Sequence, residues 1–292
     1  MSPSASTPSS HDAPRARLAF RTGRLSVRTL VGAAVLPLAM LGSALAEDLR
    51  LSGSSTVAPV MLEIGKSYED AAEGTRVFVE TGGSGKGIAD LRKGLTDIGM
   101  ISRPLLDDED DLIAHTIAKD GIAVLVGADN EVASLTPDQV RAIFTGEVDN
   151  WSEVGGADRQ IVVVSKGEGS ATSEVLNEFL GLTPDQIRGD LVAAENAQMI
   201  KTVAASPGSV GYVSIGAALV DMELGVPIRL IGLGDVEPTA ENVANGSYKA
   251  TRPLSLVTLK DPEGAAGELI AFSRSPEVAS IITGLTYVPT AQ

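Results

Sequence analysis

Short apolar runs alternate with amphipathic segments along the chain from residue 47 onward. The short runs are rich in valine, isoleucine and leucine, and they predict strands at 48–51, 76–80, 97–100, 122–126, 161–164, 209–213 and 253–258. Segments in which apolar residues recur every three or four positions predict helices at 57–72, 85–93, 137–144, 171–179, 264–272 and 277–283, with a further helix start at 183–184. This alternation is typical of α/β proteins, in which helices flank a mostly parallel sheet.

Two extended apolar segments, 121–127 and 210–214, bracket the middle of the chain. Extended segments that cross between two compact units form a hinge, so we expect two lobes joined by a two-strand hinge. The expected boundaries are 47–125 for the first part of lobe one, 126–211 for lobe two, and 212–292 for the second part of lobe one. No repeat of 20 to 50 residues is visible, which excludes solenoids and propellers.

Residues 1–46 differ from the rest of the chain. Five arginines precede an apolar run at 30–41, and Ala44-Leu45-Ala46 follows it. This order predicts a secretory signal peptide over 1–46 with an A-x-A cleavage site. The apolar run is shorter than the roughly 20 residues of a membrane-spanning helix. We therefore expect a periplasmic mature protein that starts near Glu47, and the alternative is a disordered tail.

The composition excludes several classes of partner and chemistry. The full chain has a formal net charge of −15, and the predicted signal holds five basic residues and one acid, so the remainder is more acidic still. Such a surface argues against nucleic acid as a partner. The chain has no cysteine, and its two histidines are His11 and His115, so neither thiolate chemistry nor a histidine-rich metal site is expected. We expect His115 to be an ordinary strand residue, and we expect a monomer without cofactor or metal.

Four clusters of small polar residues mark candidate ligand contacts, and they lie at 53–56, 82–85, 102–103 and 169–172. Three of them precede a predicted helix, where unpaired backbone N–H groups and about half a positive charge favour an anion. Hydroxyl groups add rotatable donors, and glycine permits close backbone approach. A single cluster can equally be an ordinary helix cap or turn. Three in one α/β chain favour a ligand site beyond the carboxyl ends of the strands.

Arg103 and Lys166 are the candidate charged members of this site. Arginine grips two oxygens of a tetrahedral anion through its planar fork, whereas lysine acts as a point charge. Lys166 follows the strand at 161–164 and can point into the same crevice, with Glu168 as the partner expected to fix it. The alternative for each cation is a solvated surface position. The acidic run 107–111 is expected to begin a helix, where negative charge is favourable.

A catalytic site is not predicted. A serine hydrolase needs a base, and the one histidine beyond the predicted signal has no spacing to a serine or an acid that would place it. The stretch 82–87 does not satisfy the phosphate-loop pattern, and 107–111 does not match a calcium loop. A secreted phosphatase remains the enzymatic alternative.

Six stretches in this order make the chain resemble the periplasmic phosphate-binding proteins of ABC transporters. They are 51–59 (LSGSSTVAP), 82–87 (GGSGKG), 96–104 (TDIGMISRP), 143–155 (IFTGEVDNWSEVG), 169–172 (GSAT) and 207–213 (PGSVGYV). The resemblance implies a two-lobe periplasmic binding protein fold of the second type. It also implies a dehydrated phosphate, or a similar oxyanion, held between the lobes and delivered to an inner-membrane ABC permease.

Carried over position by position, the resemblance and the cluster analysis together give a set of ligand-binding residues. They are Ser55, Thr56, Ser84, Ser102, Arg103, Lys166, Ser170, Ala171 and Thr172. Lys166 stands where the family usually has arginine, and Ala171 where it has glycine. Some relatives carry at the position of Arg103 an aspartate that accepts a proton from hydrogen phosphate and repels sulfate. These departures affect the choice between phosphate and other oxyanions as the ligand. The alternative function, still that of a binding protein, is a sensor or transporter subunit for a different anion.

Overall fold

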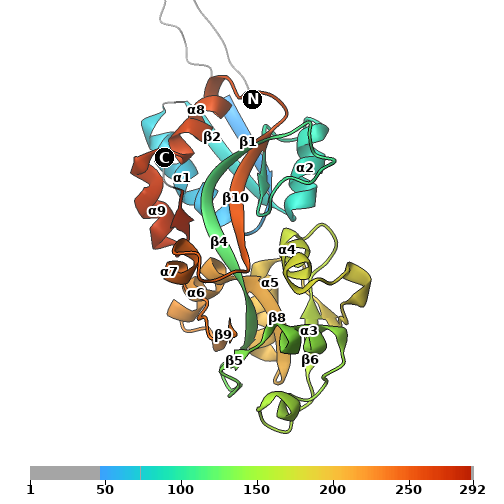
Figure 1. Cartoon of the computed structure of the whole chain (residues 1–292). Coiled ribbons are helices and arrows are strands. Elements are labelled where there is room, and N and C mark those ends of the chain that lie inside the picture. Colours follow the sequence, from blue (N-terminus) through green and yellow to red (C-terminus); the bar gives the residue numbers. More distant parts are fainter. Residues whose placement is uncertain (1–46, 73, 291–292) are drawn as a thin grey trace, which may run out of the picture. The chain divides into compact units, whose positions relative to one another are not determined.

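The computed structural model describes residues 47–72 and 74–290 (Figure 1). The predicted signal peptide, residues 1–46, lies outside the described residues. Within the described part of the chain, no helix has the length and apolar character needed to cross a membrane.

The first sheet region is built around strands from both ends of the chain. Its order is β2 (Thr75–Thr81), β1 (Glu47–Gly53), β3 (Ile98–Ile101), β10 (Thr251–Thr258) and the first half of β4 (Ile113–Gly127). The pairs that β1 makes with β2 and β3 are parallel, whereas β10 runs antiparallel to both β3 and β4. The short strand β11 (Val288–Pro289) adds to β4.

The second sheet region begins on the same strand, because the second half of β4 pairs antiparallel with both β8 (Ser209–Ser214) and β9 (Ile228–Leu233). Strand β6 (Val162–Ser165) then joins β8 to β7 (Leu191–Val192) through parallel pairs, and β5 (Ser134–Leu135) pairs with β9. Strand β4 thus takes part in both sheet regions (Figure 1).

Helices flank the strands. They are α1 (Ala58–Ala71), α2 (Ser84–Arg92), α3 (Pro137–Thr145), α4 (Ala171–Leu180), α5 (Asn196–Ala205), α6 (Ile215–Glu223), α7 (Ala240–Ala244), α8 (Gly264–Ser273) and α9 (Ala279–Gly284). The described residues also form three short 3-10 helices, η1 (Trp151–Val154), η2 (Pro184–Gln186) and η3 (Pro276–Val278).

The second half of β4 shows why its sequence is continuously apolar. Ile122, Val124 and Val126 pack into a core with α3 and α4. Leu125 packs on the opposite face, into a core with α5 and α6. Because successive side chains of a strand point to opposite faces, a strand covered on both sides has no polar alternation.

Most predicted elements are found within a residue or two, and two expectations are corrected. The acidic run 107–111 does not begin a helix but forms turns, in which Glu109 is buried. The helix start at 183–184 gives only η2. The expectation that His115 is a strand residue is confirmed, and its strand continues through 122–126 as β4. The predicted lobe boundaries stay a prediction, and β9, which follows residue 212, pairs with the second half of β4.

Two glycines let the first junctions approach one another. Gly53 has a φ of 135°, and a Cβ there would stand 2.3 Å from the carbonyl oxygen of Met100. Gly87 in α2 lies against the end of β1, where a Cβ would stand 2.6 Å from the carbonyl oxygen of Ser52. The carbonyl oxygen of Gly53 also accepts from the N–H groups of Gly82 and Gly83. These contacts hold the segments at 53–56, 82–85 and 100–102 together.

We expect Gly87→Ala to lower the free energy of unfolding by about 2 kcal/mol, because the methyl group has no room against the backbone of β1. Gly284→Ala is the matched control, since it also lies in a helix but has no atom within 4 Å of its Cβ position. Urea denaturation followed by circular dichroism should show the control unchanged or stabilised by up to about 1 kcal/mol. Equal effects of the two substitutions would contradict the close packing of α2 on β1.

Candidate functional site

The predicted junctions converge on one small cavity. Its wall consists of Ser54, Ser55, Thr56, Gly83, Ser84, Ser102, Lys166, Ser170, Ala171, Thr172, Ala194 and Glu195. The cavity is small, because the space that the centre of a water molecule can occupy within it is only about 10 Å³. Eight of the nine predicted ligand-binding residues are in this wall, and Arg103 is the exception.

The four junctions reach the cavity from strand ends and helix starts. Ser55 and Thr56 lie between β1 and α1, and Ser84 is the first residue of α2. Ser170 caps α4 by accepting from the N–H of Ser173, and Ala171 and Thr172 form the first turn of that helix. The start of α4 therefore presents backbone N–H groups and the positive end of its dipole to this region.

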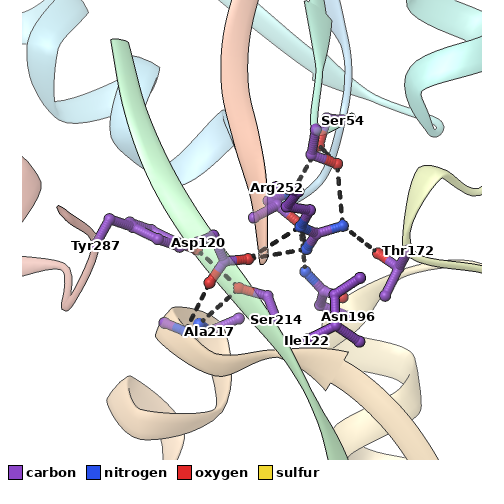
Figure 2. Close-up of polar contacts among 12 residues, drawn as sticks. Ser54, Asp120, Ile122, Thr172, Asn196, Ser214, Ala217, Arg252 and Tyr287 are labelled. Atoms are coloured by element: carbon purple, nitrogen blue, oxygen red, sulfur yellow. Dashed lines mark hydrogen bonds and ion pairs between the residues drawn. The ribbon is translucent and has the colours of Figure 1, made fainter. Parts of the chain in front are cut away.

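Arg252 organises the hydroxyl groups of the cavity wall, although it was not predicted as a site residue. Its Nη1 donates to the Oγ1 of Thr172 at 2.8 Å and to the Oγ of Ser102 at 3.3 Å, and its Nη2 donates to the Oγ1 of Thr56 at 3.0 Å. Figure 2 shows the guanidinium between Asp120 and Thr172. Residues from three junctions are thus tied to one side chain.

Asp120 holds Arg252 in this position. Its Oδ2 accepts from the Nη2 of Arg252 at 2.9 Å and from the Nε at 3.2 Å, and both side chains are buried. The two residues lie directly opposite each other in the antiparallel pair of β10 and β4. In the sequence, Asp120 lies two residues before the apolar run 122–126, and Arg252 lies directly before 253–258. Neither position indicates which residue the charge pairs with.

The hydrogen-bond pattern fixes which way the hydroxyl protons can point. A hydroxyl group has one donor and two acceptor positions. The Oγ1 of Thr56 accepts from Arg252 and from the Nδ2 of Asn196, and the Oγ of Ser102 accepts from Arg252 and from Ser54. Both acceptor positions are filled, and no described residue accepts either proton. These two protons are therefore free to donate to an occupant of the cavity.

Lys166 brings a positive charge to the same wall. Its Nζ donates to the Oδ1 of Asn196 at 3.1 Å, and its backbone N–H donates to the hydroxyl of Tyr212 at 3.0 Å. Burial, and then the positive charge of Arg252, lower the pKa of Lys166 to about 7, while the charge of Glu195 opposes the shift. A nearby anion would restore the charged form, because opposite charges favour ionisation. The expectation that Glu168 fixes Lys166 is wrong: Asn196 does so, and Glu168 is exposed.

Arg103 lies apart from the cavity wall. Its two Nη atoms each donate to an oxygen of Glu109 at 2.7 Å, and its Nε forms an ion pair with Glu174 of α4 at 2.5 Å. Burial acts to lower the pKa of Arg103, but the hydrogen bond with Glu109 and the charge of Glu174 raise it above its usual value. The guanidinium fork expected to grip an anion is thus engaged by two carboxylates.

His115 offers no base to the cavity. It lies in β4 and its ring Nε2 is 3.0 Å from the hydroxyl of Thr258, away from the cavity wall. Burial lowers its pKa, as does the charge of Arg274. No three His, Cys, Asp or Glu side chains gather into a possible metal site in the described parts of the chain.

Comparisons with known proteins agree over most of the chain. Residues 38–277 match a family model described as a PBP superfamily domain. Phosphate-binding protein PstS of Bacillus subtilis is 27% identical over 248 residues, which cover 83% of this chain and 80% of the relative. An ABC-type phosphate transport receptor from Vibrio cholerae is 32% identical with a TM-score of 0.67, covering 83% of this chain and 100% of that one. A substrate-binding protein with bound phosphate from Clostridium perfringens is 29% identical with a TM-score of 0.78, covering 84% and 100%.

We expect Asp120→Asn to lower the free energy of unfolding by about 3 kcal/mol, because it leaves the charge of Arg252 buried without a partner. Asp129→Asn is the matched control, since it breaks the pair with Arg159 at the surface, where both side chains are about half exposed. Exposed pairs contribute about 0–1 kcal/mol. Urea denaturation measures both, and equal small effects would contradict a structural role of the Asp120–Arg252 pair.

Proposed function

We infer that this chain, which belongs to the PBP superfamily, captures inorganic phosphate or a similar tetrahedral oxyanion and delivers it to an ABC transporter. The predicted α/β fold of the type II periplasmic binding proteins is confirmed by the sheet topology and by the structural neighbours. The relatives named for phosphate binding or phosphate transport support the ligand class.

The free hydroxyl protons at the cavity carry the proposal. Thr56 and Ser102 use both acceptor positions within the protein, so each can only donate to an occupant. The start of α4 and the ammonium group of Lys166 add further donors. Hydrogen bonds to a charged group contribute about 1.5–3 kcal/mol each. A few of them supply the roughly −8 kcal/mol that corresponds to micromolar affinity.

The size of the cavity favours a small ion over an organic solute. Sites for larger ligands have volumes of about 300 Å³ or more. In the cavity at the four junctions, the volume that the centre of a water molecule can occupy is only about 10 Å³. A tetrahedral oxyanion of five heavy atoms is the ligand class that combines this size with many acceptors.

We propose that the protein acts as a binding protein and not as a phosphatase. The family is one of binding proteins, and the cavity wall contains serine and threonine hydroxyls but no histidine to activate them. We also propose that eight of the nine predicted ligand-binding residues, all except Arg103, bind the ligand, and that the chain forms two lobes, with 47–125 in lobe one and 126–211 in lobe two. The pairing of β9 with β4 favours a later return to lobe one, near β10.

The proposed setting is the periplasm, with release of the ligand to an inner-membrane permease and a monomeric protein. The arginine-rich, apolar start of the sequence supports secretion, and the relatives named as transport receptors support the permease. Because Arg103 is engaged by carboxylates, it contributes to this site only by holding α4 near the turn at 107–111.

Calorimetry with phosphate, arsenate, sulfate and molybdate tests the proposed ligand class. We expect Thr172→Val to weaken phosphate binding about 10- to 100-fold, because it removes a hydroxyl that Arg252 orients at the start of α4. Thr283→Val, an exposed position in α9, is the control and should bind as the unmodified protein does. The absence of heat with every tetrahedral oxyanion would refute the function.

Anion binding should take up a proton above pH 7. The lowered pKa of Lys166 leaves it mostly neutral at pH 8 in the free protein, and a bound anion raises that pKa again. We expect the share of the uptake due to Lys166 to approach one proton per anion at pH 8 and to fall toward none at pH 6, in addition to any proton that phosphate itself gains or loses; this share weakens the affinity as the pH rises. Titrations in two buffers with different ionisation enthalpies measure this number.

Lys166→Arg is the matched control, since arginine stays charged at both pH values. It should lower the uptake at pH 8 by about one proton relative to the unmodified protein, while the proton exchange of phosphate itself remains, and it should raise the affinity for phosphate at pH 8. The same uptake in this variant as in the unmodified protein would show that phosphate itself, rather than Lys166, gains the proton.

A further inference from the structure

One tyrosine hydroxyl joins two of the segments that line the cavity. The hydroxyl of Tyr212 accepts from the backbone N–H of Lys166 at 3.0 Å, and it shares a hydrogen bond of 2.6 Å with the Oγ of Ser173. Lys166 directly follows β6, whereas Ser173 lies in the first turn of α4. Tyr212 itself belongs to β8 and is not in the cavity wall. A side chain from a third element thus connects the segment that carries the ammonium group with the start of α4.

Ser173 extends this connection to a second residue of the cavity wall. Its backbone N–H donates to the Oγ of Ser170 at 3.4 Å. Ser170 and Lys166 both line the cavity. Tyr212 therefore contacts one predicted ligand-binding residue directly and a second one by way of Ser173, although it does not reach the ligand space itself.

Tyr212 is fixed in place by the core. It is 1% exposed, and its ring packs edge-to-face on the ring of Phe144 in α3, with the ring centroids 5.4 Å apart. Its backbone lies opposite Val124 in the antiparallel pair of β8 and β4. Burial raises the pKa of the hydroxyl, which keeps it neutral near pH 7. The hydroxyl is thus a fixed point to which the two surface segments attach.

We propose that Tyr212 is a positioning residue of the anion site: its hydroxyl sets the distance between Lys166 and the start of α4, so that both donate to the same ion. The inference rests on the proposed function, because it concerns the binding of that ion. Donors that are held in place before the ligand arrives lose less conformational freedom when it binds. Support of this kind from a neighbouring side chain determines whether a site has the correct geometry.

Loss of the hydroxyl would release both segments. Among the described residues, the backbone N–H of Lys166 would lose its acceptor, and a buried donor without an acceptor is unfavourable. We therefore expect the segment after β6 to move toward solvent, which would leave Lys166 less buried. The charges of Arg252 and Glu195 also act on the pKa of Lys166, and the substitution of Tyr212 leaves both unchanged. A less buried Lys166 would keep its proton at a higher pH.

Calorimetry with phosphate on Tyr212→Phe tests the inference. This variant keeps the ring and its packing on Phe144 but loses both hydrogen bonds of the hydroxyl. We expect it to bind phosphate about 10-fold more weakly than the unmodified protein. The share of the proton uptake due to Lys166 at pH 8 should also fall, because Lys166 would already be charged in the free protein.

Tyr248→Phe is the matched control. Tyr248 is also 1% exposed, and its hydroxyl donates to the carbonyl oxygen of Ile122 at 2.8 Å, away from the cavity wall. Both variants should unfold at a lower temperature than the unmodified protein. The affinity for phosphate and the proton uptake should change only in Tyr212→Phe. The same loss of affinity in both variants would overturn the inference, since it would reflect stability alone.

Ser173→Ala tests the contact with α4 separately. It should weaken phosphate binding by about 3- to 10-fold, and the double variant with Tyr212→Phe should bind no more weakly than Tyr212→Phe alone, because both changes break the same connection. Independent, multiplying effects would overturn the inference, as would an unchanged affinity in Tyr212→Phe. In either case, phosphate binding by the unmodified protein would uphold the proposed function. No heat with any oxyanion would instead contradict the proposed function, and the inference would fall with it.

Discussion

The buried ion pair between Asp120 and Arg252 is the interaction on which the arrangement of the site depends. Each residue enters the interior only because the other is directly opposite it in the ladder of β4 and β10. A buried pair of this kind is weak evidence for stability by itself, since desolvation offsets much of the attraction. Here the pair fixes the orientation of the guanidinium. Because Asp120 binds one side of it, the remaining N–H groups donate to the hydroxyls of Thr56, Ser102 and Thr172.

That arrangement explains how a strongly acidic chain can offer a site for an anion. The net charge of −15 is spread over the surface, whereas the potential in the cavity is set by the nearest groups. Arg252 fills one acceptor position in each of Thr56 and Ser102, and Asn196 and Ser54 fill the second, so these two hydroxyl protons remain for an occupant. Asn196 acts in the same way, since it accepts from Lys166 and donates to Thr56. The donors are therefore oriented before any ligand arrives.

Lys166 and Glu195 bring one basic and one acidic side chain to the cavity wall. The ammonium group loses its charge more readily than an exposed lysine does, because it is buried near Arg252. The carboxylate oxygen of Glu195 is buried without a partner. Arg103, in contrast, serves to connect the turn around Glu109 to α4 through Glu174.

The sequence by itself determined the order of most strands and helices and eight residues of the cavity wall, because these depend on local periodicity and on small residues next to helix starts. It did not reveal Asp120, Arg252, Asn196 or Glu195, and it placed Arg103 in the wall. Those positions depend on which strands pair, in which register, and on which carboxylates meet which cations. Some of these contacts join residues more than a hundred positions apart, as Arg252 and Asp120 show, and only the tertiary structure decides them.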